Sequence, residues 1–211
     1  MNNGQYLIDA VANGALFALV ALGVGLIFGV MRLVNFAHGE LLVAGGYTLA
    51  ITKDWPVVLS IVTSFVVIIV LALVLEFTAF RRLRKASPTT MLVLTFALSF
   101  LLRAIAQRIW TAQGKSVNQL ADLNKAFELG ELNIRWVTPI AIVVSALLLL
   151  GTQALLTKTD VGLRMRAVAS DAATAETLGI RVNRVVRSTF VLASVLAGFA
   201  TLLFSVQRPV I

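Results

Sequence analysis

The sequence predicts an all-α protein, a polytopic transmembrane helical bundle with about six spans, and three observations carry this prediction. Of the 211 residues, 59% are apolar and only 13% are charged, whereas an average soluble domain carries about 25% charge. The apolar residues gather in blocks of about 20, the length of a helix that crosses a hydrocarbon core of roughly 30 Å. Basic residues stand beside these blocks, as they do in membrane proteins. The composition therefore argues against a water-soluble fold.

Six segments are expected to cross the membrane: 15–31, 36–51, 57–80, 91–107, 137–157 and 189–206. No basic residue precedes the first segment, so it is a retained span and not a signal peptide. Within it, Ala21, Gly25 and Gly29 recur every four residues, which predicts close approach by a neighbouring helix. The second segment reaches the length of a span only if residues 36–40 are included.

The distribution of cations predicts the orientation of the chain. The basic run at 81–85 follows the third span and marks a cytoplasmic end. Alternation of the spans then places eleven of the eighteen Lys and Arg residues in the cytoplasm, and it places the segment 108–136 and both ends of the chain outside. The bias agrees with the positive-inside rule.

The sequence offers little material for catalysis. It has no Cys, one His and no pair of acidic residues within a span, so we expect no catalytic residues, no metal site and no cofactor. Residues 114–116 imitate the end of an ATP-binding loop, but Ile109 stands where the loop needs its first glycine. The cations lie beside apolar blocks, which argues against nucleic-acid binding.

Asn35, His38, Gly39 and Glu40 form a polar cluster that the predicted spans place at membrane depth. One interpretation is a polar helix start that Asn35 caps, and the other is a break in the membrane that lines a pathway. His38 and Glu40 are two residues apart, about 200° around a helix, and would not share a face. For Glu76, a salt bridge or surface contact near Arg81 is favoured over a transport role.

The polar segment 158–187 lies between the last two spans. It is rich in alanine and predicts one or two short helices that end at Gly179. Such helices are too polar to insert. They either lie on anionic membrane lipid or form a docking surface for a cytoplasmic partner.

Two signatures make the chain similar to a known family. The first is the run Val34-Asn35-Phe36-Ala37-His38-Gly39-Glu40, and the second is Thr159-x-x-Gly162-x-x-x-Arg166-Ala167 followed by Ala175-x-x-x-Gly179-Ile180. In order and spacing they resemble the permeases of branched-chain amino-acid ABC importers, the LivH-type family. The first run is specific, and the second resembles the loop that couples such permeases to their ATPases.

The resemblance implies a single permease domain over residues 1–211, with a cytoplasmic coupling loop at 158–187, in the bacterial inner membrane. The implied partners are a second permease subunit, two cytoplasmic ATPase subunits and an extracytoplasmic binding protein. ATP hydrolysis would belong to the partners, so the chain is not an enzyme. Since the family continues beyond the sixth span, we expect further C-terminal spans to be missing here.

The resemblance also assigns roles to residues. Gly162, Arg166, Ala167, Ala175 and Gly179 would couple the chain to the ATPase. The polar cluster would belong to the translocation pathway for branched-chain or related amino acids. Two alternatives stay open: the same machine for urea or short amides, and a self-contained secondary transporter or channel.

Overall fold

The computed structural model describes residues 3–83, 86–110, 123, 125–129 and 132–207. Arg84, Lys85, the Walker-like residues 114–116 and the end of the chain at 208–211 lie outside the described residues. The described part of the chain is built from helices and one short strand pair, which confirms the predicted all-α class.

The long described helices are α1 (Asn3–Met31), α2 (His38–Ile51), α3 (Val57–Leu75), α5 (Pro88–Trp110), α6 (Val137–Lys158) and α9 (Val182–Gln207). Five segments that correspond to all of these except α2 are long and apolar enough to cross a membrane. Helix α2 has 14 residues, a rise of about 21 Å, which is short of the roughly 30 Å of the hydrocarbon core. The expected set of about six spans is therefore present as five full-length helices and one shorter helix.

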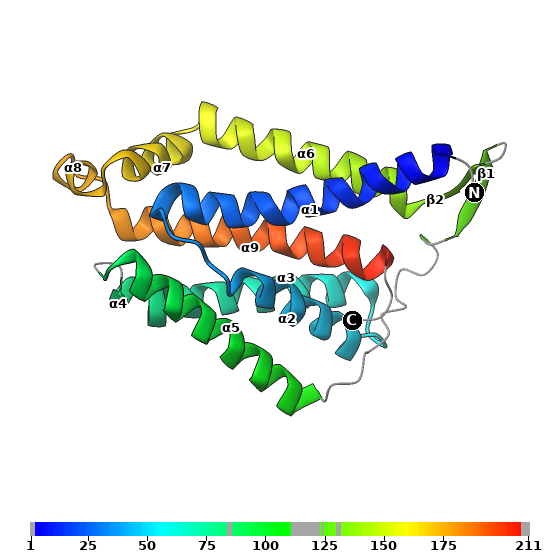
Figure 1. Cartoon of the computed structure of the whole chain (residues 1–211), viewed down its shortest axis with the longest axis horizontal. Helices are drawn as coiled ribbons and strands as arrows, with labels where there is room; N and C mark the ends of the chain where they lie inside the picture. Colours follow the sequence, from blue (N-terminus) through cyan, green and yellow to red (C-terminus); the bar gives the residue numbers. More distant parts are fainter. Residues whose placement is uncertain (1–2, 84–85, 111–122, 124, 130–131, 208–211) are drawn as a thin grey trace.

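The shorter helix corrects the expected second span. We expected helix from residue 36, but α2 begins only at His38. Arg32 has a φ of 55°, a left-handed conformation that ends α1, and residues 33–37 are not helical. Figure 1 shows this stretch running back along the bundle from the end of α1 before α2 begins.

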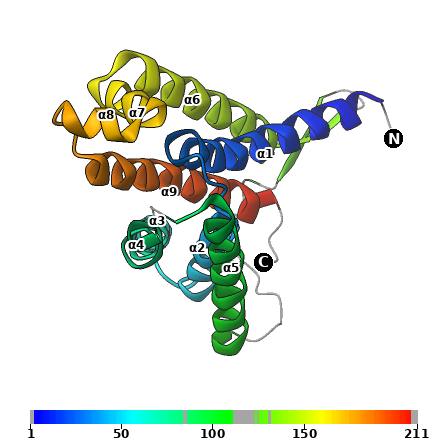
Figure 2. The same cartoon turned by 60° about the vertical axis from the view of Figure 1, so that its left-hand side comes forward.

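Helix α9 lies at the centre of the bundle, with α6 and α5 on opposite sides of it (Figures 1 and 2). In its most apolar window 67% of the residues are buried, against 17–28% for the other four candidate spans. Small side chains allow this packing: Ala193, Ala197 and Ala200 are buried. At Gly198, an added Cβ would lie only 2.6 Å from Cε1 of Phe65 in α3, so α3 and α9 approach each other closely there.

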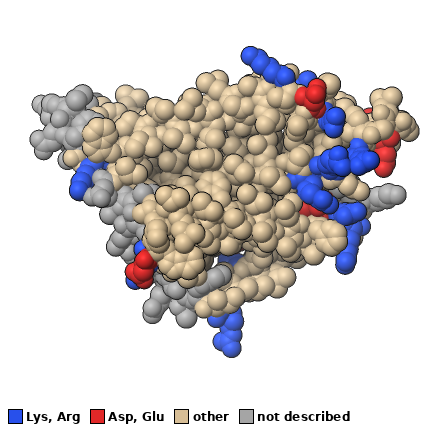
Figure 3. Space-filling view, turned by 180° about the vertical axis from the view of Figure 1, so that it is seen from behind, with Lys and Arg blue, Asp and Glu red and all other residues tan. Residues whose placement is uncertain are grey.

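The two ends of the bundle differ in charge. One end carries the π-helical turn η1 (Glu76–Phe80), α4 (Arg81–Leu83), α7 (Asp160–Ser170) and α8 (Ala172–Thr177). We call it the basic end, because its described cations are Arg32, Arg81, Arg82, Lys158, Arg164, Arg166, Arg181, Arg184 and Arg187. Figure 3 shows the basic side chains gathered there.

The opposite end holds a feature that the sequence did not predict. Within the segment expected to be a polar loop, β1 (Ala126–Leu129) and β2 (Leu132–Arg135) pair antiparallel, with Ala126 opposite Arg135. The start of α1 and the end of α9 also lie at this end (Figure 1). Residues 111–122 of the expected loop lie outside the described residues.

Candidate functional site

Asn35 turns the chain into α2. Its side chain is buried, and its Oδ1 accepts a hydrogen bond from the Ala37 amide at 3.1 Å. Its carbonyl oxygen accepts a second bond, from the His38 amide, also at 3.1 Å. An Asn side chain that holds an amide two residues further on favours a turn over a continuing helix. Asn35 therefore fixes where α2 begins.

His38 lies inside the bundle, at the junction of α1, α2 and α9. Its side chain is 1% exposed. A Cβ added to Gly23 of α1 would lie 2.6 Å from Nε2 of the imidazole and 3.4 Å from the carbonyl oxygen of Ala193 in α9. Within the described residues, no hydrogen bond reaches either ring nitrogen. The absence of a side chain at Gly23 is what makes room for the imidazole.

Glu40 points away from His38, toward α5. Its Oε1 accepts hydrogen bonds from Oγ of Ser99 at 2.9 Å and from Nη2 of Arg103 at 3.0 Å. The Glu40 side chain is 5% exposed and the Arg103 side chain is 62% exposed. The different surroundings of His38 and Glu40 agree with the prediction that they do not share a helix face.

Sequence reasoning missed the two α5 partners of Glu40. It placed Arg103 near the outer interface and did not consider Ser99. The available signal was a cation and a hydroxyl four residues apart in an otherwise apolar stretch, which places both on one face of a helix. That spacing does not say which acid they meet, because Glu40 lies about sixty residues earlier in the chain.

Two open clefts meet at Glu40. The first, of about 490 Å³, lies between the start of α2 and α5 and is lined by Phe36, Gly39, Glu40, Val43, Phe96, Ser99, Phe100 and Arg103. The second, of about 470 Å³, lies between α2, α3 and α5, shares Glu40 and Val43 with the first, and is otherwise lined by Val, Leu, Ile and Ala. Of the four candidate pathway residues, Gly39 and Glu40 line the clefts, while Asn35 and His38 are buried behind them.

Glu76 is the first residue of the π-helical turn η1 and is 1% exposed. The carboxylate is therefore inside the bundle. The expected surface contact is wrong, because it required the carboxylate to reach the membrane surface. Arg81 is exposed and lies over the ring of Phe77, with its Cζ 5.5 Å from the ring centroid. The expected salt bridge between Glu76 and Arg81 stays a prediction.

At the basic end, α7 is held against the end of α6. Thr159 caps α7, since its Oγ1 accepts a hydrogen bond from the Gly162 amide at 3.2 Å. Gly162 is buried, and a Cβ there would collide with the carbonyl oxygens of Leu155 and Leu156. Nη1 of Arg166 donates a hydrogen bond to the Leu156 carbonyl. Two of the predicted coupling residues thus fix the angle between α6 and α7.

Helix α8 has a defined start and stop. Oδ1 of Asp171 accepts hydrogen bonds from the amides of Ala173 and Thr174. The Thr174 hydroxyl and these amides hold the pKa of Asp171 below its usual value. Gly179 has a φ of 84°, and the amides of Gly179 and Ile180 donate to the carbonyls of Glu176 and Ala175, which is a Schellman motif. The predicted helix end at Gly179 is confirmed.

Three of the five predicted coupling residues, Gly162, Ala167 and Ala175, face inward, whereas Arg166 and Gly179 are exposed. Ala175 is 3% exposed and belongs to the same buried cluster as Met165 and Val185, and Ala167 packs against that cluster. The exposed apolar side chains of this region are Val161, Leu163 and Leu178, the last 77% exposed. The predicted residues shape the two short helices, and the large apolar side chains of their outer surface come from other residues.

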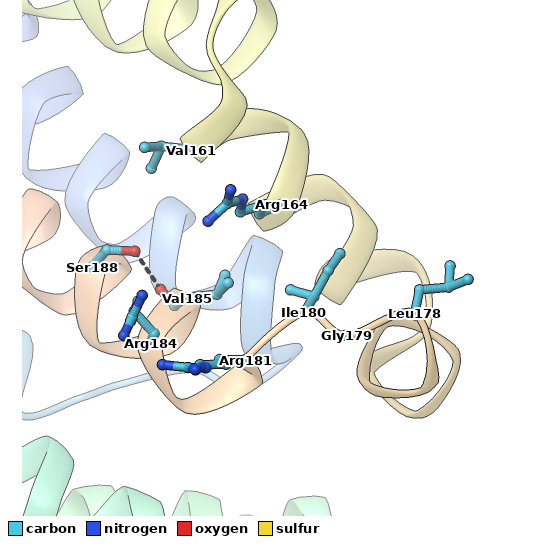
Figure 4. Close-up of a pocket in the computed structure, with 9 residues that line it drawn as sticks. All are labelled: Val161, Arg164, Leu178, Gly179, Ile180, Arg181, Arg184, Val185 and Ser188. Atoms are coloured by element: carbon cyan, nitrogen blue, oxygen red, sulfur yellow. Dashed lines mark hydrogen bonds between the residues drawn. The ribbon is translucent and has the colours of Figure 1, made fainter.

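A hollow of about 400 Å³ opens between α7, α8 and the start of α9, and Figure 4 shows its lining: Val161, Arg164, Leu178, Gly179, Ile180, Arg181, Arg184, Val185 and Ser188. Arg164 comes from α7, whereas Arg181 and Arg184 come from the chain at the start of α9. None of the described residues that line it is Asp or Glu. The hollow therefore has positive charge at its rim and apolar side chains beside it.

Arg32 joins this region to the start of α2. Its Nε and Nη2 both donate hydrogen bonds to the carbonyl oxygen of Ala169, at 3.3 Å each. Ala169 lies in the last turn of α7, and Arg32 is the residue at which α1 ends. The stretch that leads into the polar cluster is thus physically connected to α7.

The described bundle combines three features: apolar helices long enough to cross a membrane, a broken polar segment beside open clefts, and short polar helices at the basic end. Together they define a multi-pass membrane protein of the permease class. Residues 6–211 match the family described as "Branched-chain amino acid transport system / permease component", and the chain belongs to this family. The resemblance drawn from the two signatures is confirmed, and the family is one of transport permeases, not of enzymes.

Curated relatives agree with the family match. The chain is 27% identical to the high-affinity branched-chain amino acid transport system permease protein BraD of Pseudomonas aeruginosa, over 98% of this chain and 72% of the relative. It is 26% identical to LivH of Escherichia coli strain K12, over 94% of this chain and 69% of the relative. It is 29% identical to the probable branched-chain amino acid transport permease protein LivH of Methanocaldococcus jannaschii, over 90% of this chain and 62% of the relative. No solved structure matches the chain.

Proposed function

We propose that the chain is the permease subunit of an ATP-driven ABC importer that moves branched-chain or related amino acids across the bacterial inner membrane. The family match over residues 6–211 carries this proposal, and the names of the relatives supply the substrate class. The partners would be a second permease subunit, two cytoplasmic ATPase subunits and an extracytoplasmic binding protein. Membrane lipid surrounds the exposed apolar faces.

The polar cluster supplies part of the pathway in this proposal. Gly39 and Glu40 line the clefts between α2, α3 and α5, where a solute at the depth of the break would meet them. Asn35 and His38 are buried and do not line the clefts. Asn35 sets the start of α2, and His38 fills the junction with α1 and α9. This division supports a pathway bordered by Gly39 and Glu40 and a buried support formed by Asn35 and His38.

The coupling residues act through the shape of α7 and α8. Gly162 and Arg166 hold α7 on α6, Ala167 and Ala175 pack inward, and Gly179 ends α8. The ATPase subunit would contact the outer surface that these residues hold in place, including Leu163 and Leu178. The basic end would face the cytoplasm, in keeping with the positive-inside rule.

The orientation has a direct test, since the natural chain has no Cys. A single Cys replaces Leu178 at the basic end, or Trp55 between α2 and α3 at the opposite end; both side chains are exposed. We expect a membrane-impermeant thiol reagent to label Trp55→Cys in intact cells and to label Leu178→Cys only after the cells are opened. The reverse pattern would refute the orientation.

The function is tested by uptake into proteoliposomes that hold the purified complex, with ATP supplied on the side of the basic end. We expect uptake of leucine, isoleucine and valine that needs both ATP and the binding protein and is insensitive to ionophores. Uptake of urea or short amides in their place would support the same machine with another substrate. Uptake that persists without ATP and is abolished by ionophores would indicate a secondary transporter.

A further inference from the structure

The pair formed by Glu40 and Arg103 is unusual for an ion pair inside a helical bundle. Only one of its members is buried: Glu40 is 5% exposed, whereas the Arg103 side chain is 62% exposed and lines the open cleft between α2 and α5. Ionisable side chains in membrane segments are costly and most often serve a solute or ion. A pair whose only task was to fasten α5 to α2 would not need an open cleft of about 490 Å³ around it.

The bonding of the two side chains leaves donors and acceptors unused. Within the described part of the chain, both side-chain hydrogen bonds to Glu40 reach Oε1, one from Ser99 and one from Arg103, so Oε2 is left for another donor. Toward the described residues, Arg103 donates from Nη2 alone, although a guanidinium has five N–H donors and can bind a carboxylate through two parallel hydrogen bonds. A free carboxylate oxygen and a free guanidinium edge therefore lie side by side in the cleft.

We propose that Glu40, Ser99 and Arg103 form a binding site for the charged groups of a free α-amino acid, and this inference rests on the proposed amino-acid transport. The substrate carboxylate would bind the free edge of the Arg103 guanidinium, and the ammonium group would bind Oε2 of Glu40. The hydroxyl of Ser99 holds Oε1 of Glu40 at 2.9 Å and so keeps the carboxylate turned toward the cleft. Arg103 and Ser99 belong to α5, outside both sequence signatures.

The surroundings select for an apolar side chain. Phe36 and Phe96, whose rings stack 4.1 Å apart, and Phe100 line the same cleft. Next to Glu40, the second cleft of about 470 Å³ is lined by aliphatic residues of α2, α3 and α5. A small charged centre beside an apolar chamber of a few hundred Å³ is the usual form of a site for a small amphipathic ligand. A branched aliphatic side chain fits this chamber, and a charged side chain does not.

The test uses the purified importer complex in lipid nanodiscs and, as probe, a leucine analogue that carries a photoreactive diazirine in its side chain. After illumination, mass spectrometry locates the label. We expect it on peptides that contain residues 36–43 and 96–103, with competition by leucine. Leucinamide lacks the carboxylate and N-acetyl-leucine lacks the ammonium group, so both should compete at least about tenfold less well, because each leaves one charged partner without its hydrogen bond.

Matched variants separate this site from a purely structural pair. Arg103→Lys keeps the charge but loses the planar guanidinium that can form two parallel hydrogen bonds to a carboxylate. Ser99→Ala keeps the ion pair but frees the Glu40 carboxylate to turn. Each variant should lower labelling about tenfold. Arg108→Lys on the same helix and Ser145→Ala on α6, neither of which lines the clefts, should label as the unaltered chain does. Membrane level and co-elution of the complex are measured for every variant.

The outcomes are distinct. Labelling elsewhere, equal competition by the blocked analogues, or full labelling of a well-assembled Arg103→Lys variant would overturn the site. ATP-driven leucine uptake is measured in the same preparations: if uptake persists while the label lies elsewhere, the site is wrong and the proposed function stands. If the label lies in the cleft but no leucine is taken up, the site stands and the importer function fails.

Discussion

Replacement of Gly23 by Ala tests the contact that holds α1 against the start of α2. The added Cβ would lie 2.6 Å from Nε2 of His38, 3.0 Å from its Cε1 and 3.4 Å from the Ala193 carbonyl oxygen. Ordinary contacts begin near 3.4 Å, so the imidazole has to move by several tenths of an ångström. It has little room to do so, because His38 is 1% exposed.

The magnitude follows from two opposing effects. Overpacking of this kind costs about 1–3 kcal/mol, and the change from Gly to Ala inside a helix recovers about 1 kcal/mol. We therefore expect Gly23→Ala to lower the free energy of unfolding by up to about 2 kcal/mol. Gly25→Ala is the control on the same helix: Gly25 is exposed, no described residue lies within 4 Å of its added Cβ, and the change should be neutral or stabilising.

The assay is an SDS titration of the detergent-solubilised chain, followed by circular dichroism. A double-mutant cycle with His38→Ala isolates the contact, because removal of the imidazole leaves the added methyl group free space. We expect the double variant to lose less stability than the sum of the single ones, by about 1 kcal/mol or more. If Gly23→Ala and Gly25→Ala behave alike, or if the cycle shows no coupling, the contact between Gly23 and His38 is refuted.

Three further predictions concern the basic end. Leu178→Ser should leave stability unchanged and weaken co-purification of the ATPase, since Leu178 is 77% exposed. Ala175→Trp should instead disrupt α8 itself, because Ala175 is buried. Limited proteolysis separates the two effects, since only a disrupted α8 becomes easier to cleave. Gly179→Ala should cost about 1 kcal/mol in thermal unfolding, because its φ of 84° is unfavourable for a residue with a Cβ, and Gly179→Asn should cost less. The cap at Asp171 should persist at neutral pH and be lost only as the pH falls through the lowered pKa of its carboxyl, measured by hydrogen exchange of the Ala173 and Thr174 amides.

The spans were predictable because length and hydropathy decide them locally. The segment expected at 137–157 is found as α6 over Val137–Lys158, and the third span ends in the basic run as expected. The last helix begins at Val182, before the expected 189, because its first turns are amphipathic: Val182, Val185 and Val186 are buried, while Arg181, Arg184 and Arg187 are exposed. A hydropathy window averages these opposite faces and misses the turns.

The contacts between helices were not predictable, because they depend on which faces meet. Gly25 and Gly29 carry the spacing of a helix contact, yet both are exposed and no described residue lies within 4 Å of an added Cβ. Among the glycines of α1, the one that packs against other described helices is Gly23, which has no small residue four positions away and meets a His that lies fifteen residues later in the sequence. The break before α2 likewise depends on a left-handed Arg32, a conformation that sequence rules assign to Gly or Asn.

Arg32 links the two sequence signatures physically. On one side, its guanidinium binds the Ala169 carbonyl in the last turn of α7. On the other side, the Val34 carbonyl, two residues further on, accepts a hydrogen bond from Oγ1 of Thr95 in α5 at 3.3 Å. The non-helical stretch 33–37 is therefore attached to α7 just before its start and to α5, the helix of Arg103, near its middle. It contains Asn35 and leads directly into α2. A displacement of α7 by a bound ATPase would act on this stretch first, since among the described residues it lacks the helical hydrogen bonds that hold the long helices on either side. The clefts at Glu40 lie between the two elements, α2 and α5, that this stretch connects, so a movement at the basic end is expected to change the distance between Glu40 and Arg103.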